Sequence, residues 1–164
     1  MFHVENRSYA NKREHYADLA EQARSMLAGE PDPVANAANF AALVFHALPD
    51  LNWAGFYLND GKELVVGPFQ GKPACIRIAF GKGVCGTAAS SRQTQVVHDV
   101  AALDNHIYCD SASQSEIVVP LIRADGSLYG VWDVDSPHVG RFDAEDRVGM
   151  EALCRVFMAA LDSE

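Results

Sequence analysis

The spacing of apolar residues predicts helices at both ends of the chain. Residues 12–28 repeat apolar positions at helical intervals, and Gly29 follows where a helix commonly ends. Asp32 followed by proline is typical of a helix N-cap, so a second helix is predicted from there to about residue 48. A last helix is predicted over residues 143–161. The apolar face of the first helix comprises Tyr16, Leu19, Ala20, Ala23 and Leu27.

Between these helices the pattern changes to short apolar runs that are typical of strands. Two turn signals, Asn59-Asp60-Gly61 and Asp125-Gly126, join neighbouring runs as hairpins. The predicted strands span residues 53–58, 64–69, 76–80, 94–97, 116–123 and 128–135, with a short helix over 84–91.

These elements predict one α+β domain over residues 1–164. Strands joined by tight turns form a mostly antiparallel sheet, here of six strands. Helices from the two ends of the chain can pack on one face of this sheet, which leaves the other face for ligand loops. The chain is long enough to bury such a core without disulfides or metals.

Composition narrows the classes of partner. The net charge of −9 argues against nucleic acid, and the basic residues are scattered singly rather than clustered for an anionic membrane surface. The N-terminus has no apolar core of a leader peptide, and no apolar run approaches membrane-spanning length. We therefore expect a cytoplasmic protein that binds neither nucleic acid nor membrane.

Four cysteines have to be interpreted for a reducing compartment, where structural disulfides are rare. None of them forms a C-x-x-C pair, so neither a thioredoxin-type motif nor a zinc ribbon is indicated. Cys154 lies among core-type residues of the last helix and is expected to be a buried thiol. Cys85 lies near the start of a short helix, which lowers the pKa of a thiol and makes Cys85 a candidate redox partner, although simple packing beneath a glycine turn explains it equally well.

Cys109 lies in the long polar loop over residues 99–115, and loops of that length are usually functional or disordered. A loop thiol beside a histidine, here His106, can act as a nucleophile because a neighbouring cation or dipole favours the thiolate. Two alternatives stay open. His106 and Cys109 could hold zinc together with other cysteines, or His106 could only anchor the loop.

The second hairpin predicts a cluster of carboxylates. If residues 125–126 form a two-residue turn, Glu116 lies directly opposite Asp135, and Asp133 shares the same face of the sheet. Like charges placed opposite one another destabilise a sheet, so this cluster requires an explanation.

Three explanations of the acids are compatible with the sequence. They could be solvated at frayed strand ends, or they could bind Mg²⁺ or Ca²⁺. They could instead hold a substrate amine, with one carboxyl kept protonated near neutral pH by its crowded neighbours. The apolar neighbours Val118, Val131 and Trp132 favour this third explanation because they predict a partly dry site.

Together these groups predict a class of reaction. A thiolate can attack an electrophilic sulfur or oxygen and leave a sulfenic acid, which a second thiol resolves as a disulfide. A protonated carboxyl could donate to the departing oxygen. Trp53 and Tyr57 could form an aromatic wall for a small apolar group, or could simply pack in the core. Sulfoxide reduction fits these parts, but the spacing alone does not identify the substrate.

Several short motifs spread along the chain form a specific set. They are NAAN (36–39), WAGFYL (53–58), PFQGKPAC (68–75), FGKGVCG (80–86), HIYCDSAS (106–113), SEIVVP (115–120) and DVDS (133–136). With these motifs the chain resembles the free methionine-R-sulfoxide reductase family, which has a GAF-domain fold. The likeness spans nearly the whole chain, and generic sensory GAF domains lack the three-cysteine pattern.

The resemblance implies thiol-dependent reduction of free L-methionine-(R)-S-oxide to L-methionine, through a sulfenic acid and an intramolecular disulfide. It implies that Cys109 is the attacking cysteine, Cys75 the principal resolving cysteine and Cys85 a further redox cysteine. Recycling by thioredoxin and a homodimeric state are also implied, and we expect no cofactor and no metal.

The resemblance further implies the substrate site. Glu116, Asp133 and Asp135 match acids that bind the substrate amine and polarise the sulfoxide. Trp53 and Tyr57 match aromatic residues that line the pocket, with Trp53 near the substrate methyl group.

Two positions depart from the family pattern. Tyr108 stands where a small residue is usual, and Trp132 stands where an aliphatic residue is usual. Either departure could alter the width of the pocket or the mobility of the loop. Two other functions also remain open, namely a non-catalytic GAF module that binds a small ligand and a thiol sensor that is oxidised without turning over a sulfoxide.

Overall fold

The computed structural model describes residue 2 and residues 7–163. Part of the N-terminal stretch used for the prediction of no leader peptide, residues 1 and 3–6, lies outside the described residues. The elements in chain order are α1 (Lys12–Leu27), α2 (Pro33–Ala47), β1 (Trp53–Asn59), β2 (Leu64–Gly71), β3 (Arg77–Ile78), α3 (Gly83–Ser91), β4 (Gln95–Val97), a 3-10 turn (Val100–Ala102), β5 (Ser115–Ile122), β6 (Leu128–Ser136) and α4 (Ala144–Leu161). This order is the predicted one.

The helices begin and end within one residue of the predicted positions. The capping residues that the sequence indicated are among those that end them in the structure. The Asp32 side chain accepts a hydrogen bond from the backbone N–H of Ala35 at 2.8 Å. Gly29 follows α1 with a φ of +76°, a conformation that glycine adopts without strain. Asp143 and Asp146 form a reciprocal capping box at the start of α4.

All six strands form one antiparallel sheet in the order β3-β2-β1-β6-β5-β4. The predicted α+β class is therefore confirmed. The strand predicted over residues 76–80 is shorter than expected, because the chain turns at Gly81 (φ +78°) toward α3 after pairing only Arg77 and Ile78. No helix in the described part of the chain is long and apolar enough to cross a membrane.

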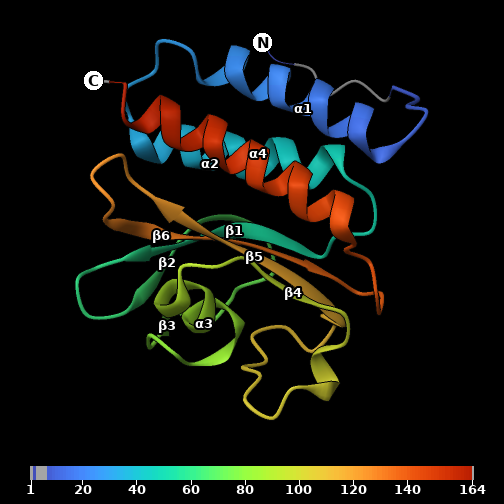
Figure 1. Ribbon diagram of the computed structural model, residues 1–164, viewed down its shortest axis with the longest axis vertical. Helices are drawn as coiled ribbons and strands as arrows, with labels where there is room; N and C mark the ends of the chain where they lie inside the picture. The colour runs from blue at the N-terminus through green and yellow to red at the C-terminus, as the bar shows by residue number, and fades with distance from the viewer. Residues whose placement is uncertain (1, 3–6, 164) are drawn as a thin grey trace.

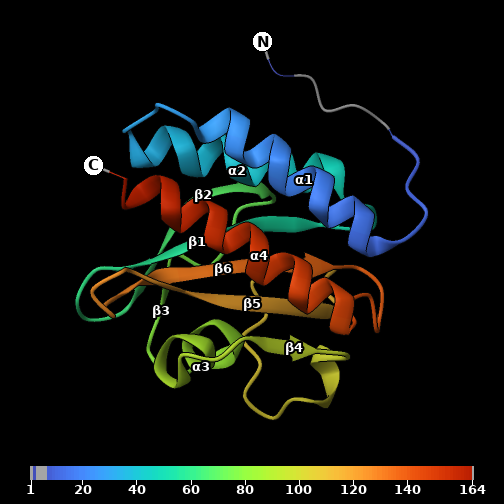
Figure 2. The same cartoon turned by 45° about the horizontal axis from the view of Figure 1, so that its top comes forward.

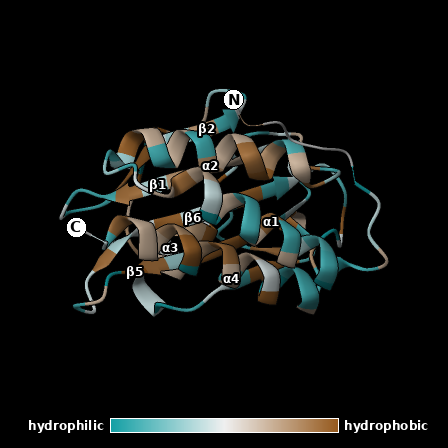
Figure 3. Ribbon diagram, turned by 90° about the horizontal axis from the view of Figure 1, so that it is seen from above, coloured by the Kyte–Doolittle hydropathy of each residue, from teal (hydrophilic) through white to brown (hydrophobic). Residues whose placement is uncertain are grey.

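The two faces of the sheet have different coverings (Figures 1 and 2). Helices α2 and α4 pack on one face, and α1 lies beyond them, farther from the sheet. Helix α3 and the long loop after β4 lie on the opposite side. Figure 3 shows hydrophilic and hydrophobic residues mixed along the three outer helices, as expected for amphipathic elements. The main hydrophobic core therefore lies between the sheet and helices α1, α2 and α4. The opposite face of the sheet is available for a functional site.

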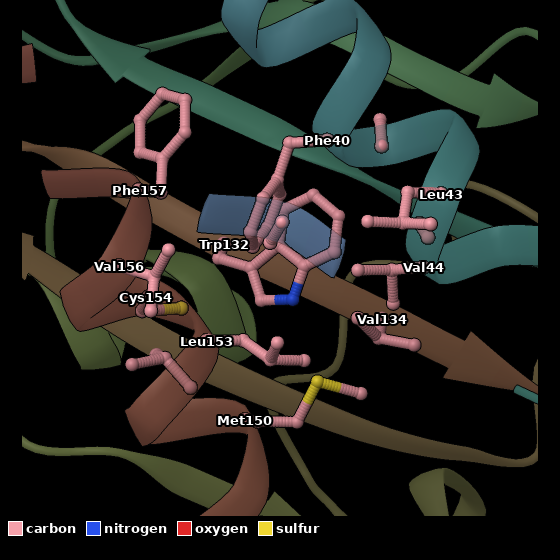
Figure 4. Close-up of a cluster of buried hydrophobic side chains, with 14 of the residues drawn as sticks. Phe40, Leu43, Val44, Trp132, Val134, Met150, Leu153, Cys154, Val156 and Phe157 are labelled. Atoms are coloured by element: carbon pink, nitrogen blue, oxygen red, sulfur yellow. The ribbon is translucent and has the colours of Figure 1, made fainter. Parts of the chain in front are cut away.

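Aliphatic and aromatic side chains fill the core between the sheet and the helices (Figure 4). Trp132 of β6 packs edge-on against Phe40 at a ring separation of 4.9 Å and also contacts Phe56. The prediction that Trp132 lies beside the carboxylates is therefore wrong, because alternate residues of a strand face opposite sides and Trp132 is next to Asp133. Cys154 is a buried core thiol, as expected.

The hairpin between β5 and β6 has a different turn from the predicted one. The backbone N–H of Arg123 donates to the carbonyl of Ser127 at 2.9 Å, so the loop has three residues, 124–126, rather than two. Gly126 has a φ of +86°, which supplies the left-handed conformation that a three-residue hairpin loop requires.

A second irregularity cancels the first. The register shifts between Leu121 and Ile122, which places one additional residue on β6. From that point on the strands pair as predicted, and Glu116 lies opposite Asp135. The predicted register of the acids is confirmed, although the turn from which it was derived is wrong.

Gly149 permits the close crossing of α1 and α4. A Cβ atom at this position would overlap the ring of Tyr16, whose hydroxyl is fixed by a 2.8 Å hydrogen bond to the buried Asp146 carboxylate. Helix propensity alone predicts that Gly149→Ala stabilises the protein by about 1 kcal/mol. We expect destabilisation by about 1–3 kcal/mol instead, measured by urea unfolding, because the fixed ring cannot move aside. Val148→Ala, at an exposed neighbouring position, is the control, and a stabilised Gly149→Ala protein would contradict the packing argument.

Candidate active site

Three carboxyl groups converge on the face of the sheet opposite the helices. Glu116 of β5 lies opposite Asp135 of β6. Asp133 is two residues before Asp135 in β6 and so lies on the same face of the sheet. Glu116 is 6% exposed and Asp133 is 5% exposed. Asp135 is partly exposed, but its Oδ1 is buried and it pairs with Glu116 within the sheet. The acids are therefore not solvated at frayed strand ends, which excludes the first of the three explanations.

Burial changes the protonation of this cluster. It raises the pKa of Glu116 to about 8, and the negative charge of Asp135 contributes in the same direction. Burial also raises the pKa values of Asp133 and Asp135 well above the usual range. One carboxylate oxygen of each aspartate is buried without a hydrogen-bond partner among the described residues. These oxygens can accept hydrogen bonds from a ligand.

Cys85 lies in the first turn of α3 and is buried against the acids. Its Sγ is 3.9 Å from Oε1 of Glu116. Burial, followed by the charges of Asp133 and Glu116, raises the pKa of this thiol well above its usual range. The expectation of a lowered pKa is wrong, because desolvation and adjacent carboxylates outweigh the helix N-terminus.

Cys75 and Cys109 form a disulfide, with their Cα atoms 5.2 Å apart. Cys75 follows β2, and Cys109 lies in the loop before β5, 34 residues later. Cys85 and Cys154 are free thiols. Two of the four cysteines therefore meet at the edge of the acidic cluster.

A network of polar side chains fixes the loop that carries Cys109. The Asp110 carboxylate accepts hydrogen bonds from the backbone N–H of Ala112 at 2.9 Å and from the Asn52 side chain at 3.1 Å. The Ser113 hydroxyl donates to Asp135 at 2.9 Å and accepts from Asn52. Sequence reasoning missed Asn52 and Ser113. The stretch Asp110-Ser111-Ala112, typical of an Asx turn, was the available signal.

Aromatic residues of β1 fix the segment that carries Cys75. The Tyr57 hydroxyl donates to the carbonyl of Cys75 at 3.0 Å, and the Trp53 indole donates to the carbonyl of Lys72 at 3.2 Å. The Trp53 ring stacks between Tyr57 and Phe69. The two predicted aromatic residues thus lie at the site and also hold one of its cysteines in place.

His106 contacts the acids rather than Cys109. Its Nε2 is 3.2 Å from Oε2 of Glu116, and its side chain is only 4% exposed. Burial lowers the pKa of His106, so the imidazole is neutral near pH 7. Tyr108 is 56% exposed and packs edge-on against the His106 ring. Tyr108 lines neither of the two cavities beside Cys109. Its link to the site is through the His106 ring and the loop that carries both residues.

One set of side chains has the spacing of a metal site. Single atoms of Cys85, Glu116 and Asp133 lie within 4.8 Å of one another. Two carboxylates and a thiol do not suit Mg²⁺ or Ca²⁺, which take six or more oxygen ligands. Zinc sites in proteins usually have several Cys or His ligands, and this set has one. The arrangement favours acid chemistry over metal binding.

Two small cavities border the disulfide on its inner side. One, of about 20 Å³, is lined by Cys85, His106, Cys109 and the three acids. The other, of about 10 Å³, lies between Trp53, Tyr57, Cys109 and the two aspartates. Spaces of this size hold about one water each. With the disulfide formed, the site is closed to a larger ligand.

The chain is similar in sequence and in fold to known proteins. The sequence profile of the GAF domain family matches residues 34–162. The chain is 53% identical to protein YtsP of Bacillus subtilis over 98% of this chain and 99% of that protein. It is 50% identical to the free methionine-R-sulfoxide reductase of Escherichia coli over 87% of this chain and 86% of that protein. The X-ray structure of free methionine-R-sulfoxide reductase from Neisseria meningitidis in complex with its substrate superposes with a TM-score of 0.92 at 43% identity, over 99% of this chain and 97% of that chain.

The raised pKa of Glu116 has a consequence for stability. Between pH 4.5 and about 8 the folded protein keeps a proton that the unfolded chain loses, so stability falls as the pH rises through this range. Glu116→Gln cannot ionise, and it should lose less stability between pH 5 and pH 8, by up to about 1.4 kcal/mol per pH unit. Urea unfolding of the disulfide-linked proteins measures this difference. Glu145→Gln, at an exposed acid of α4, is the control, and equal pH slopes for all three proteins would contradict the burial argument.

Proposed function

This chain belongs to the free methionine-R-sulfoxide reductase family, whose fold is the GAF domain, and we propose that it reduces free L-methionine-(R)-S-oxide to L-methionine with Cys109 as the attacking thiol. The reaction makes it an oxidoreductase that acts on a sulfur group. The observation that carries the proposal is the disulfide between Cys109 and Cys75 beside a cluster of three carboxyl groups, two of them buried.

The proposed reaction accounts for this disulfide. The Cys109 thiolate attacks the sulfoxide sulfur, the sulfur–oxygen bond breaks, and the oxygen passes to Cys109 as a sulfenic acid while methionine leaves. The Cys75 thiol then attacks the sulfenic sulfur, a disulfide forms, and the oxygen leaves as water. The sulfoxide gains two electrons, which the two cysteines lose. Cys85, which lines the same cavity as Cys109, is the proposed further redox cysteine.

The acids have two proposed tasks. The unpartnered oxygens of Asp133 and Asp135 accept hydrogen bonds from the substrate ammonium group. Glu116, whose pKa of about 8 keeps it protonated near neutral pH, polarises the sulfoxide oxygen. Trp53 and Tyr57 form the apolar wall, with Trp53 beside the substrate methyl group. Support for these roles comes from the shared position of the five residues beside Cys109.

Four further features belong to the same proposal. Thioredoxin reduces the disulfide, because a protein dithiol is suited to thiol–disulfide exchange at an enzyme disulfide. The enzyme works in the cytoplasm, where such reductants keep thiols reduced. It forms a homodimer. Residues 1–164 act as one domain, since α1, which precedes the matched residues 34–162, packs on α4 and contributes Tyr16 to the common core.

An epimer-resolved assay tests the function. With NADPH, thioredoxin and thioredoxin reductase, we expect NADPH to be oxidised on addition of free methionine-R-sulfoxide but not of the S epimer. Cys109→Ser should lose turnover entirely because no other thiol replaces the nucleophile, whereas Cys154→Ser, which changes a buried thiol of the helical core, should retain it.

The possible outcomes separate the alternatives. Full activity of Cys109→Ser would refute the mechanism. Peroxide oxidation of the cysteine pair without turnover of either epimer would favour a thiol sensor, and ligand binding without oxidation would favour a non-catalytic GAF module. Turnover with dithiothreitol but not with thioredoxin would refute only the proposed reductant.

The closed cavities generate a second prediction. Because cavities of about 20 and 10 Å³ cannot accommodate an amino acid, the disulfide-linked protein should not bind L-methionine measurably, whereas the reduced protein should. Calorimetric titration of both states measures this difference. Cys75→Ser, which cannot form the disulfide, should bind L-methionine with or without reductant. Equal affinity of the two states of the unmodified protein would show that the disulfide does not close the site.

A further inference from the structure

We propose that His106 is a positioning residue that donates from Nε2 to Oε2 of Glu116 and thereby keeps the carboxyl proton of Glu116 on Oε1. This inference rests on the proposed function, because it specifies how Glu116 presents its proton to the sulfoxide. Oε1 is the oxygen that faces Cys85. His106 would then act on the reaction through Glu116 and not by contact with the reacting atoms.

The geometry of the imidazole supports the contact. Nε2 of His106 lies 3.2 Å from Oε2 of Glu116, within hydrogen-bond range. Both side chains are buried, at 4% and 8% exposure, so bulk solvent has little access to either group. Both also line the cavity that borders Cys109. The pair therefore forms part of the wall of the site.

The second ring nitrogen decides where the imidazole proton lies. A neutral imidazole carries one N–H, on Nδ1 or on Nε2. Nδ1 of His106 is buried and has no hydrogen-bond partner among the described residues. An orphaned buried N–H is rarer and more costly than an orphaned acceptor. The proton is therefore more stable on Nε2, where the N–H donates a hydrogen bond to the Glu116 carboxyl.

This tautomer fixes the proton of Glu116. A neutral carboxyl has one hydroxyl oxygen and one carbonyl oxygen, and an oxygen that accepts from a nearby N–H is best as the carbonyl. Oε2 accepts from the N–H of His106 at 3.2 Å, whereas Oε1 accepts only a 3.9 Å contact from the weaker donor, the Cys85 thiol. A hydroxyl oxygen can also accept such a contact, so the hydroxyl is Oε1, on the side of Cys85. His106 thus selects which oxygen of Glu116 is the donor.

Besides burial, Asp135, Asp133 and Cys85 shift the pKa of Glu116. Several ionisable groups surround Glu116 besides His106. They are Cys85 and Lys82 at the start of α3, Asp133 and Asp135 of β6, and Tyr57 of β1. None of these groups accounts for the orphaned Nδ1 or for the contact at Oε2. The test must therefore vary His106 alone.

Two amide variants separate the two ends of the imidazole. The side-chain amide of glutamine reaches the position of Nε2, whereas that of asparagine reaches only the position of Nδ1. We expect His106→Gln to retain most of kcat and His106→Asn to lose about ten- to a hundredfold of kcat with a smaller change in KM. Dithiothreitol serves as the reductant, so that docking of a protein reductant does not enter.

The pH profile distinguishes positioning from mere packing. A donor to Oε2 favours the charged carboxylate, so its loss raises the pKa of Glu116 and moves the alkaline limb of kcat in His106→Asn to higher pH. A loosened site that admits water would lower this pKa and move the limb the other way. An unmoved or lowered limb, or equal losses in the two variants, would overturn the proposal.

A measurement on the unmodified protein keeps the inference testable if both variants fail to fold. The ¹⁵N spectrum of the imidazole reports which ring nitrogen carries hydrogen. We expect protonated Nε2 and bare Nδ1 in His106 near pH 7, and the reverse tautomer would overturn the proposal. Absence of sulfoxide turnover in the unmodified protein would refute the proposed function but leave this tautomer result standing.

Discussion

The crowding of three carboxyl groups with little access to solvent on one face of the sheet is the constraint on which the rest of the site depends. Like-charged groups in such a place are unfavourable when ionised, and this raises the pKa values of Glu116, Asp133 and Asp135. A ligand with an ammonium group relieves this cost because it supplies positive charge and hydrogen-bond donors. In the proposed function, the substrate ammonium group plays this part, and the empty protein is less stable for carrying the acids.

The two loops that carry the redox cysteines are anchored to the same face. Ser113 ties the Cys109 loop to Asp135, and Tyr57 ties the Cys75 segment to β1. Each anchor is itself a wall of the site, so the residues that hold the cysteines also define the space for the substrate. The disulfide therefore lies where two irregular segments meet over the sheet, on the side away from the helical core.

The carboxylate pairing shows how sequence reasoning can reach a correct result by a wrong route. The assumed two-residue turn is a three-residue loop, and a bulge between Leu121 and Ile122 compensates for it. Alternation along β6 could have placed Trp132 on the helical side from the start, because it precedes Asp133 by one residue. The sequence left open whether Cys85 is packed beneath the glycine turn or has a lowered pKa as a redox partner, and its burial raises that pKa instead.

Local rules in the sequence determined the helices, their caps and the order of the elements along the chain. They also determined the alternation of side chains that gathers the acids on one face. These features depend on near neighbours along the chain, whose chemistry can be read directly. The resemblance already implied that Cys75 pairs with Cys109, and the structure shows this disulfide. Only the tertiary structure decided that His106 contacts Glu116 and that Asn52 holds the Cys109 loop. These contacts join residues from separate elements, and the low polarity around them sets the protonation states. Neither the closeness of these residues in space nor their removal from water can be read from any single stretch of sequence.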